Sequence, residues 1–99
     1  MPSERHENVF RYFEGRCSYG GKRLTMYLHG EYHSQGWELD HGNPRAQGGS
    51  DHGMNHRLAC FACNRFKGAN TSQWWQYRIR EYYDGRCPTW RDGKPVKKH

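Results

Sequence analysis

The residues best suited to chemistry lie between Trp37 and Gly68. Asp40 and His41 are adjacent, a glycine-rich loop follows them, and Asn64 comes directly after a Cys-x-x-Cys pair. Hydrolysis of a phosphodiester needs a water nucleophile, a base that removes its proton, and a cation that holds the phosphate and stabilises the leaving oxygen. These residue types predict a metal-dependent centre that hydrolyses phosphodiesters.

The polar side chains suit different parts of that reaction. Asp40 and the side-chain oxygen of Asn64 are hard donors of the kind that magnesium prefers, and water and phosphate would complete the coordination shell. His41 would be neutral at about pH 7, as a general base must be. We therefore expect Asp40 and Asn64 to bind the cation and His41 to activate the water.

A hairpin followed by a helix would bring these side chains together. Residues 37–40 alternate between apolar and polar, which predicts a strand that ends at the Asp-His pair, and residues 42–44 interrupt it. Residues 57–59 predict a second short strand. A helix that begins at the Cys-x-x-Cys pair would place Asn64 and Lys67 on one face.

Two longer patterns contain these residues. From Asp40 the chain reads Asp-His-x-x-Pro-x-x-x-Gly-Gly, and from Asn55 it reads Asn-x-x-Leu-Ala-Cys-x-x-Cys-Asn-x-x-Lys-Gly. Over about a third of the chain, this combination resembles the HNH endonucleases, whose core is a ββα-metal fold. The resemblance is closest to the Asp-His…Asn…Cys-x-x-Cys-Asn branch, which includes phage endonuclease VII.

The resemblance implies a role for each motif residue. Asp40 and Asn64 would be the metal ligands, and His41 would be the general base. Asn55, the central asparagine of the motif, would fix the loop and orient His41 without touching the metal. The candidate contacts to DNA phosphates are Arg45, Arg65 and Lys67. For Arg65, a charge on a solvated helix surface is an equal alternative.

The cysteines predict a structural zinc site. The chain has four of them, Cys17, Cys60, Cys63 and Cys87. Many HNH proteins carry a further Cys-x-x-Cys ahead of the first strand, but Gly20 occupies its second position here. Because a tetrahedral zinc site takes four ligands, the remaining one must come from elsewhere in the chain. Cys87 is the candidate that completes the set.

Other readings of the cysteines remain open at this point. His29 or His33 could replace Cys87 as the fourth ligand, and the thiols could instead be free and buried. The chain has no apolar run long enough for a signal peptide or a membrane span, which favours a reducing cytoplasm. We expect the protein to be bacterial or phage-encoded. In that compartment thiolates are better read as zinc ligands than as disulfides.

Size and charge limit the class of protein. The chain has 99 residues, 33% of them hydrophobic, and a mean hydropathy of -1.27. These values predict a single domain over residues 1–99 with a modest core, which needs a cross-link such as a metal site or a disulfide for stability. The net charge of +6 points to an anionic partner, and DNA is the natural one.

Elements on both sides of the core complete the expected architecture. Ser3 can cap an N-terminal helix, and a strand is expected over Leu24 to Leu28. In the helix expected over about 72–83, Trp75, Ile79 and Tyr82 would face the core. Trp74 is a candidate for contact with DNA bases. The expected ranges are a core over about 36–68, helices over about 4–14 and 72–83, and a flexible basic tail over about 91–99.

The sequence thus predicts a small α+β protein with a ββα-metal core and a structural zinc site. Its predicted activity is metal-dependent DNA endonuclease activity with magnesium or manganese at the catalytic site, and either one copy or a homodimer could act. A zinc-stabilised nucleic-acid-binding module that does not cut explains the charge and the cysteines equally well. It gives no reason for Asp40, His41, Asn55 and Asn64 to occur together. A toxin domain taken from a larger protein is a third reading.

Overall fold

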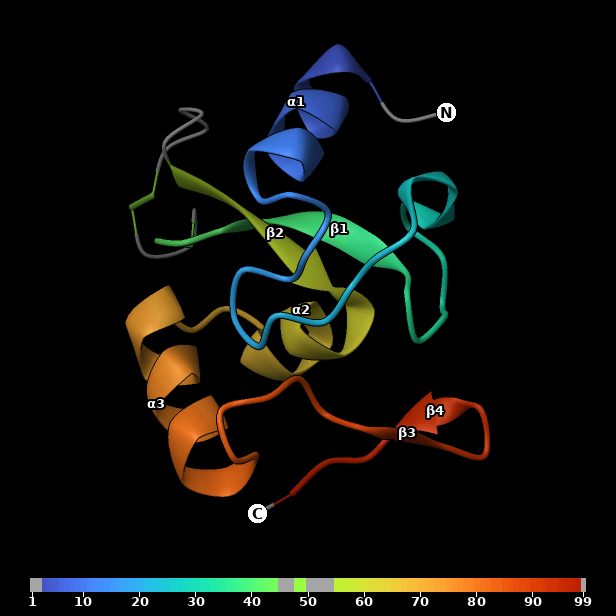
Figure 1. Ribbon diagram of the computed structural model, residues 1–99. Coiled ribbons are helices and arrows are strands. Elements are labelled where there is room, and N and C mark those ends of the chain that lie inside the picture. The colour runs from blue at the N-terminus through green and yellow to red at the C-terminus, as the bar shows by residue number, and fades with distance from the viewer. Residues whose placement is uncertain (1–2, 45–47, 50–54, 99) are drawn as a thin grey trace.

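An antiparallel hairpin and the helix that follows it form the centre of the molecule (Figure 1). In the computed structural model, which describes residues 3–44, 48–49 and 55–98, strand β1 spans Trp37–His41 and strand β2 spans His56–Cys60. Helix α2 spans Phe61–Lys67 and begins directly after β2, with Cys60 as its N-cap. The predicted α+β class and ββα arrangement are confirmed.

The strand register gives the hairpin two different faces. Trp37 lies opposite Cys60, and Leu39 lies opposite Leu58, so these side chains share one face. Glu38 and Asp40 point to the other face because successive strand residues alternate. Helix α1 lies on the apolar face and α2 on the acidic face, on opposite sides of the hairpin in Figure 1. The two carboxylates therefore face the helix that carries Asn64.

Helix α1 covers the apolar face. It spans Glu4–Tyr12 and is capped by the Ser3 side chain, as predicted, but it ends two residues earlier than expected. Glu14 and Gly15 both have positive φ angles, 57° and 69°, so the chain leaves the helical conformation before the glycine. The Phe10 ring lies 5.1 Å from the Trp37 ring, which fixes α1 against β1.

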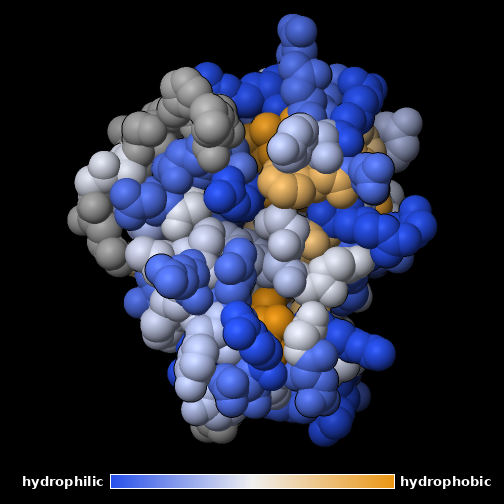
Figure 2. All heavy atoms as spheres, turned by 60° about the vertical axis from the view of Figure 1, so that its left-hand side comes forward, coloured by the Kyte–Doolittle hydropathy of each residue, from blue (hydrophilic) through white to orange (hydrophobic). Residues whose placement is uncertain are grey.

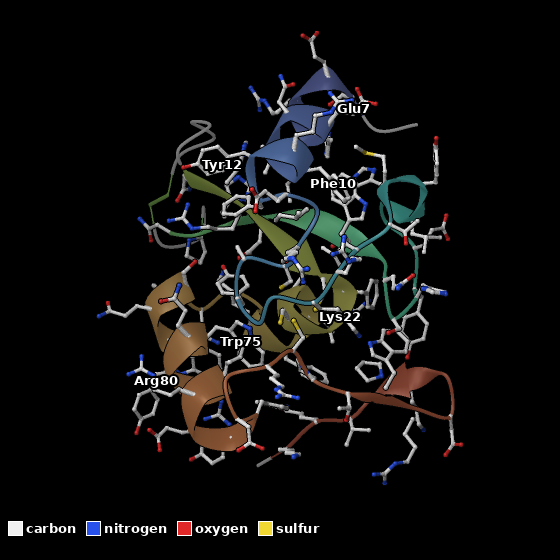
Figure 3. The ribbon with its side chains drawn as sticks, in the orientation of Figure 1. Glu7, Phe10, Tyr12, Lys22, Trp75 and Arg80 are labelled. Atoms are coloured by element: carbon white, nitrogen blue, oxygen red, sulfur yellow. The ribbon has the colours of Figure 1, made fainter. Side chains whose placement is uncertain are left out.

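Helix α3 spans Ser72–Tyr82, and the Thr71 side chain caps it. Trp75 and Ile79 are buried, with 1% and 3% of their surface exposed, and Figure 3 shows Trp75 pointing from α3 toward α2. The prediction that Tyr82 faces the core is wrong, because it is 40% exposed and Tyr83 is buried instead. The buried positions continue at a spacing of four residues, and the chain leaves the helix at that point.

The segment before β1 is not the strand that its composition predicted. Residues 26–28 form a 3₁₀ helix, η1 (Met26–Leu28). The indole nitrogen of Trp37 donates hydrogen bonds to the carbonyl oxygens of Thr25 and Met26, at 2.9 Å and 3.2 Å. This segment therefore lies against the edge of the Trp37 ring, and the carbonyl groups of Thr25 and Met26 are satisfied without strand pairing.

The basic tail also differs from the prediction. In place of a flexible segment, the structure has a short hairpin of β3 (Trp90–Arg91) and β4 (Lys94–Pro95). Asp92 and Gly93 form its turn with φ angles of 54° and 77°, the conformation that an Asp-Gly pair favours in two-residue hairpins. The backbone nitrogen of Lys98 donates to the Tyr83 hydroxyl at 2.9 Å, so the chain after the hairpin returns to the end of α3.

The buried core is small and joins α1, the β1–β2 hairpin, α2 and α3. Its largest fully buried side chains include Trp37, Leu58 and Trp75, and the four cysteines belong to the same cluster. Within the described part of the chain, no helix has the length and apolar character needed to cross a membrane.

Candidate functional site

The four cysteines come together from three separate parts of the fold. Cys17 lies after α1, Cys60 and Cys63 lie at the junction of β2 and α2, and Cys87 follows α3. Their sulfur atoms all lie within 4.8 Å of one another. A tetrahedral zinc ion with Zn–S bonds of about 2.3 Å would hold its sulfurs about 3.8 Å apart, so the cluster fits this ion after a small contraction. Cys87 is the fourth member of the cluster, and its role as a zinc ligand stays a prediction.

The electrostatics of the cluster also suit a cation. Burial raises the pKa of Cys17, but hydrogen bonds from Cys60, Cys63 and Cys87 lower it well below the usual thiol value. The hydrogen bond to Cys17 raises the pKa of Cys60, and burial raises that of Cys63. The backbone N–H groups of Cys60 and Cys63 donate to the sulfurs of Cys17 and Cys60, each at 3.3 Å. Without a metal the cluster thus favours one negative charge, on the Cys17 sulfur, and a bound zinc ion would favour the thiolate form of the other three cysteines.

Gly20 explains why the fourth cysteine comes from the end of the chain. A Cβ atom at this position would lie 2.2 Å from the backbone nitrogen of Cys87 and 2.6 Å from its sulfur. The position that would hold a second cysteine after Cys17 is therefore filled by the backbone and thiol of Cys87. The cluster that could hold a metal ion among the described residues contains the four cysteines and no histidine, so neither His29 nor His33 is part of it.

On the other side of α2, Asp40 is held by two donors. Its Oδ1 accepts a hydrogen bond from Lys67 Nζ at 3.1 Å, and its Oδ2 accepts one from the Tyr19 hydroxyl. Lys67 Nζ also donates to the carbonyl oxygen of His41 at 3.0 Å. The side chains of Asp40 and Lys67 are only 6% and 1% exposed. The Asp-His pair is therefore fixed to α2 through one buried ammonium group.

A hydroxyl chain extends this network to α3. The Tyr19 hydroxyl lies 2.6 Å from Ser72 Oγ, and because its one proton goes to Asp40, Ser72 must donate to it. Burial raises the pKa of Tyr19 far above its usual value, and the negative charge of Asp40 raises it further. Tyr19 thus remains a donor at every working pH. Sequence reasoning missed Tyr19 and Ser72, since they lie far from Asp40 in the chain.

Asn64 faces the second carboxylate of β1. Its side-chain nitrogen donates a hydrogen bond to the Glu38 carboxylate, one turn of α2 before Lys67. With the nitrogen engaged, the side-chain oxygen is the end of Asn64 that can bind a cation. Glu38 was also missed by sequence reasoning, although the alternation of β1 places it on the face of Asp40.

His41 lies at the end of β1, where the chain enters the loop. Its ring packs edge-on against the His56 ring, with centroids 5.0 Å apart. Asn55 holds the backbone of Asn43 from both sides, because its Oδ1 accepts from Asn43 N at 2.8 Å and its Nδ2 donates to Asn43 O at 3.0 Å. The Gly42 nitrogen donates to the Asn55 carbonyl at 2.7 Å. Asn55 therefore fixes the start of the loop directly after His41.

The predicted phosphate contacts have different surroundings. The buried ammonium group of Lys67 would have to break its ion pair with Asp40 to reach DNA. Its position therefore does not favour a direct phosphate contact, which stays a prediction. Arg65 is exposed, and its guanidinium lies 5.0 Å from the Phe61 ring centroid. Arg45 lies outside the described residues.

Comparison with known proteins decides the family. The model of the HNH endonuclease family matches residues 17–70, which is more than half of the chain. The chain belongs to the HNH endonuclease family. Comparison with curated proteins and with solved structures gave no significant match. The matched span of this HNH protein begins at Cys17 and contains the whole ββα unit. Family membership implies phosphodiester hydrolysis with DNA as the substrate.

The HNH family match leaves out Cys87, and substitution of Gly20 tests how that residue joins the cluster. Gly20→Ala should lower the free energy of unfolding by about 1–3 kcal/mol, because the methyl group overlaps Cys87. It should also weaken zinc binding, measured by competition with a chromogenic chelator. Gly21→Ala is the control for backbone strain: the φ angle of Gly21 is 79°, which alanine tolerates poorly, but a Cβ there meets nothing within 4 Å and so does not touch Cys87. Equal zinc affinity in the two variants would contradict this packing.

The hydrogen bond from Tyr19 to Asp40 predicts a pH-dependent stability difference. Tyr19→Phe should be less stable than the wild type by about 1–3 kcal/mol at neutral pH, because a buried carboxylate loses a donor. The raised pKa keeps Tyr19 protonated in the folded protein, whereas the unfolded phenol ionises at about pH 10. The difference in the free energy of unfolding between the wild type and Tyr19→Phe should therefore shrink above about pH 10. Urea unfolding at several pH values measures it, and a constant difference would refute the assignment.

Proposed function

We propose that the protein is a metal-dependent DNA endonuclease with a one-metal site on the acidic face of the hairpin. The observation that carries the proposal is the fixed carboxylate of Asp40 beside the helix that presents Asn64. Asp40 and Asn64 would hold magnesium or manganese. This arrangement fits the Asp-His…Asn…Cys-x-x-Cys-Asn branch of the family, which the sequence resembles.

The donor set of this face suits a hard cation. A carboxylate has about four lone-pair sites, and the two hydrogen bonds to Asp40 leave room for a metal. The side-chain oxygen of Asn64 is the second ligand, and Glu38 holds the amide nitrogen so that this oxygen is presented. When bound, the ion would act as a Lewis acid that stabilises charge on the phosphate and on the leaving oxygen.

His41 is the proposed general base. It would take a proton from the water that attacks phosphorus in line with the bond to the 3′ oxygen. Breaking that bond leaves 5′-phosphate and 3′-hydroxyl ends, the products that the family resemblance implies. Asn55 supports this role by fixing the backbone after His41, and Lys67 supports it by binding the His41 carbonyl.

A second candidate function is a nucleic-acid-binding module that does not cut. The buried ion pair of Asp40 and Lys67 favours it, because the proposed metal ligand already has a cationic partner. A metal at Asp40 must therefore bind beside the ammonium group. The positive net charge and the cysteine cluster fit both candidates.

Cleavage of supercoiled plasmid separates the two candidates. The zinc-loaded protein should nick or linearise the plasmid when magnesium or manganese is present, and Asp40→Ala should abolish this activity because it removes a metal ligand. His41→Ala should lower the rate by about 10²–10⁴-fold, the usual contribution of a general base. The rate is measured from the loss of supercoiled plasmid with time.

The matched control is His33→Ala, which removes an exposed histidine outside the proposed site and should keep wild-type activity. Zinc content and circular dichroism must match the wild type in every variant. Near-full activity in His41→Ala would remove His41 from the role of base. If the wild type shifts DNA in a gel but does not cut with either metal, the binding module is the better account.

A further inference from the structure

One face of α3 carries a row of aromatic and cationic side chains that the proposed centre does not use. Trp74, Arg78 and Tyr82 are spaced four residues apart and therefore lie along one side of the helix. The Arg78 guanidinium lies 5.1 Å from the Trp74 ring centroid and 4.7 Å from that of Tyr82. Trp74 is 38% exposed and Tyr82 is 40% exposed. Two rings thus hold one cation in place at the surface.

A cleft lies beside this row. It has a volume of about 280 Å³, and three cationic residues, Arg78, Lys97 and Lys98, contribute to its lining. Phe66 and Trp74 are among its aromatic residues. No acidic residue lines this cleft in the described part of the chain, and no carboxylate there forms an ion pair with Arg78. The cleft therefore favours an anionic ligand with a flat ring.

The surrounding surface argues against an apolar protein partner. Figure 2 brings the α3 side of the molecule forward, and the surface is mostly blue and white with small, separate orange areas. An interface for an apolar helix or sheet needs a continuous apolar patch of several hundred Å². Exposed aromatic rings among cations are instead typical of proteins that bind single-stranded nucleic acid.

The cleft lies on α2, which carries Asn64 of the proposed centre, and on α3, whose first residue is Ser72. Phe66 precedes Lys67 on α2, and Trp74 follows Ser72, which is linked to Asp40 through Tyr19. From Ser72 to Arg78 is about 9 Å along the axis of α3, at a rise of about 1.5 Å per residue. That length matches roughly two or three stacked nucleotides at about 3.4 Å each. A segment of roughly two or three nucleotides is therefore long enough to span α3 from Ser72 to Arg78.

We propose that the cleft beside α3 binds an unpaired nucleotide of the DNA substrate. Its base would stack on Trp74, and its phosphate would bind Arg78 with Lys97 and Lys98. In a duplex the base faces are covered by stacking, so only an unpaired or frayed strand offers a ring to Trp74. The inference rests on the proposed function, since it takes DNA as the substrate.

Oligonucleotide binding tests the proposal without any cleavage. Fluorescence anisotropy of the zinc-loaded full chain, without magnesium, would compare a labelled single-stranded oligothymidine with a blunt duplex. Trp74→Ala should weaken binding to the single strand roughly tenfold, in line with the loss of one stacked base, and should change binding to the duplex by less than about twofold. Trp74→Phe retains a ring and should recover most of the affinity.

Arg78→Ala and Arg80→Ala form a matched pair, because both remove one positive charge from α3. Figure 3 shows Arg80 pointing away from the body of the molecule, on the side of α3 opposite Trp75. Arg78→Ala should weaken binding to the single strand much more than Arg80→Ala does. Equal effects of the two variants would show a response to net charge alone and would overturn the proposal. Unchanged single-strand affinity in Trp74→Ala would also overturn it.

The failure of this inference is distinguishable from that of the proposed nuclease. If plasmid is cleaved but Trp74→Ala binds the single strand as the wild type does, the cleft proposal alone is wrong. If plasmid is not cleaved but the Trp74 and Arg78 variants lose single-strand affinity as expected, the cleft is supported and the catalytic proposal is wrong.

Discussion

The rest of the structure depends on the junction of four cysteine sulfurs. Only 33% of the residues are hydrophobic, and a core of this size gives a small domain little stability without a further staple. The cluster joins the turn after α1, the end of β2, the first turn of α2 and the segment after α3. Zinc bound there would add its binding free energy to the folding free energy, because an unfolded chain has no preformed site.

The same junction sets the geometry of the acidic face. Cys60 is both the last residue of β2 and the N-cap of α2, so it fixes the direction in which α2 leaves the hairpin. Cys63 directly precedes Asn64, and Cys17 lies two residues before Tyr19. The cluster therefore helps to position α2 and the Tyr19 segment, which both donate to Asp40. Each donor to Asp40 comes from a segment that is tied to a cysteine.

Sequence reasoning succeeded where the signal is local. The predictions of strand β1, of a helix beginning at the Cys-x-x-Cys pair and of the Ser3 cap used residues that are close in the chain, and the structure has these elements. Contacts between distant segments were not predictable, as the bond from Tyr19 to Asp40 shows. The prediction of a strand over residues 24–28 was wrong for the same reason, since the indole nitrogen of the distant Trp37 donates hydrogen bonds to carbonyl groups of this segment. The β3–β4 turn was a missed local signal, because Asp-Gly favours such a hairpin.

One titration tests the central claim that the cysteine cluster holds the nuclease centre in place. The zinc-loaded protein would be treated with a zinc-selective chelator in excess magnesium, while plasmid cleavage, circular dichroism and thiol exposure are followed in one sample. The account predicts that all three change together as one zinc ion per chain is removed. Cleavage that persists after zinc has left and the thiols are exposed would contradict it.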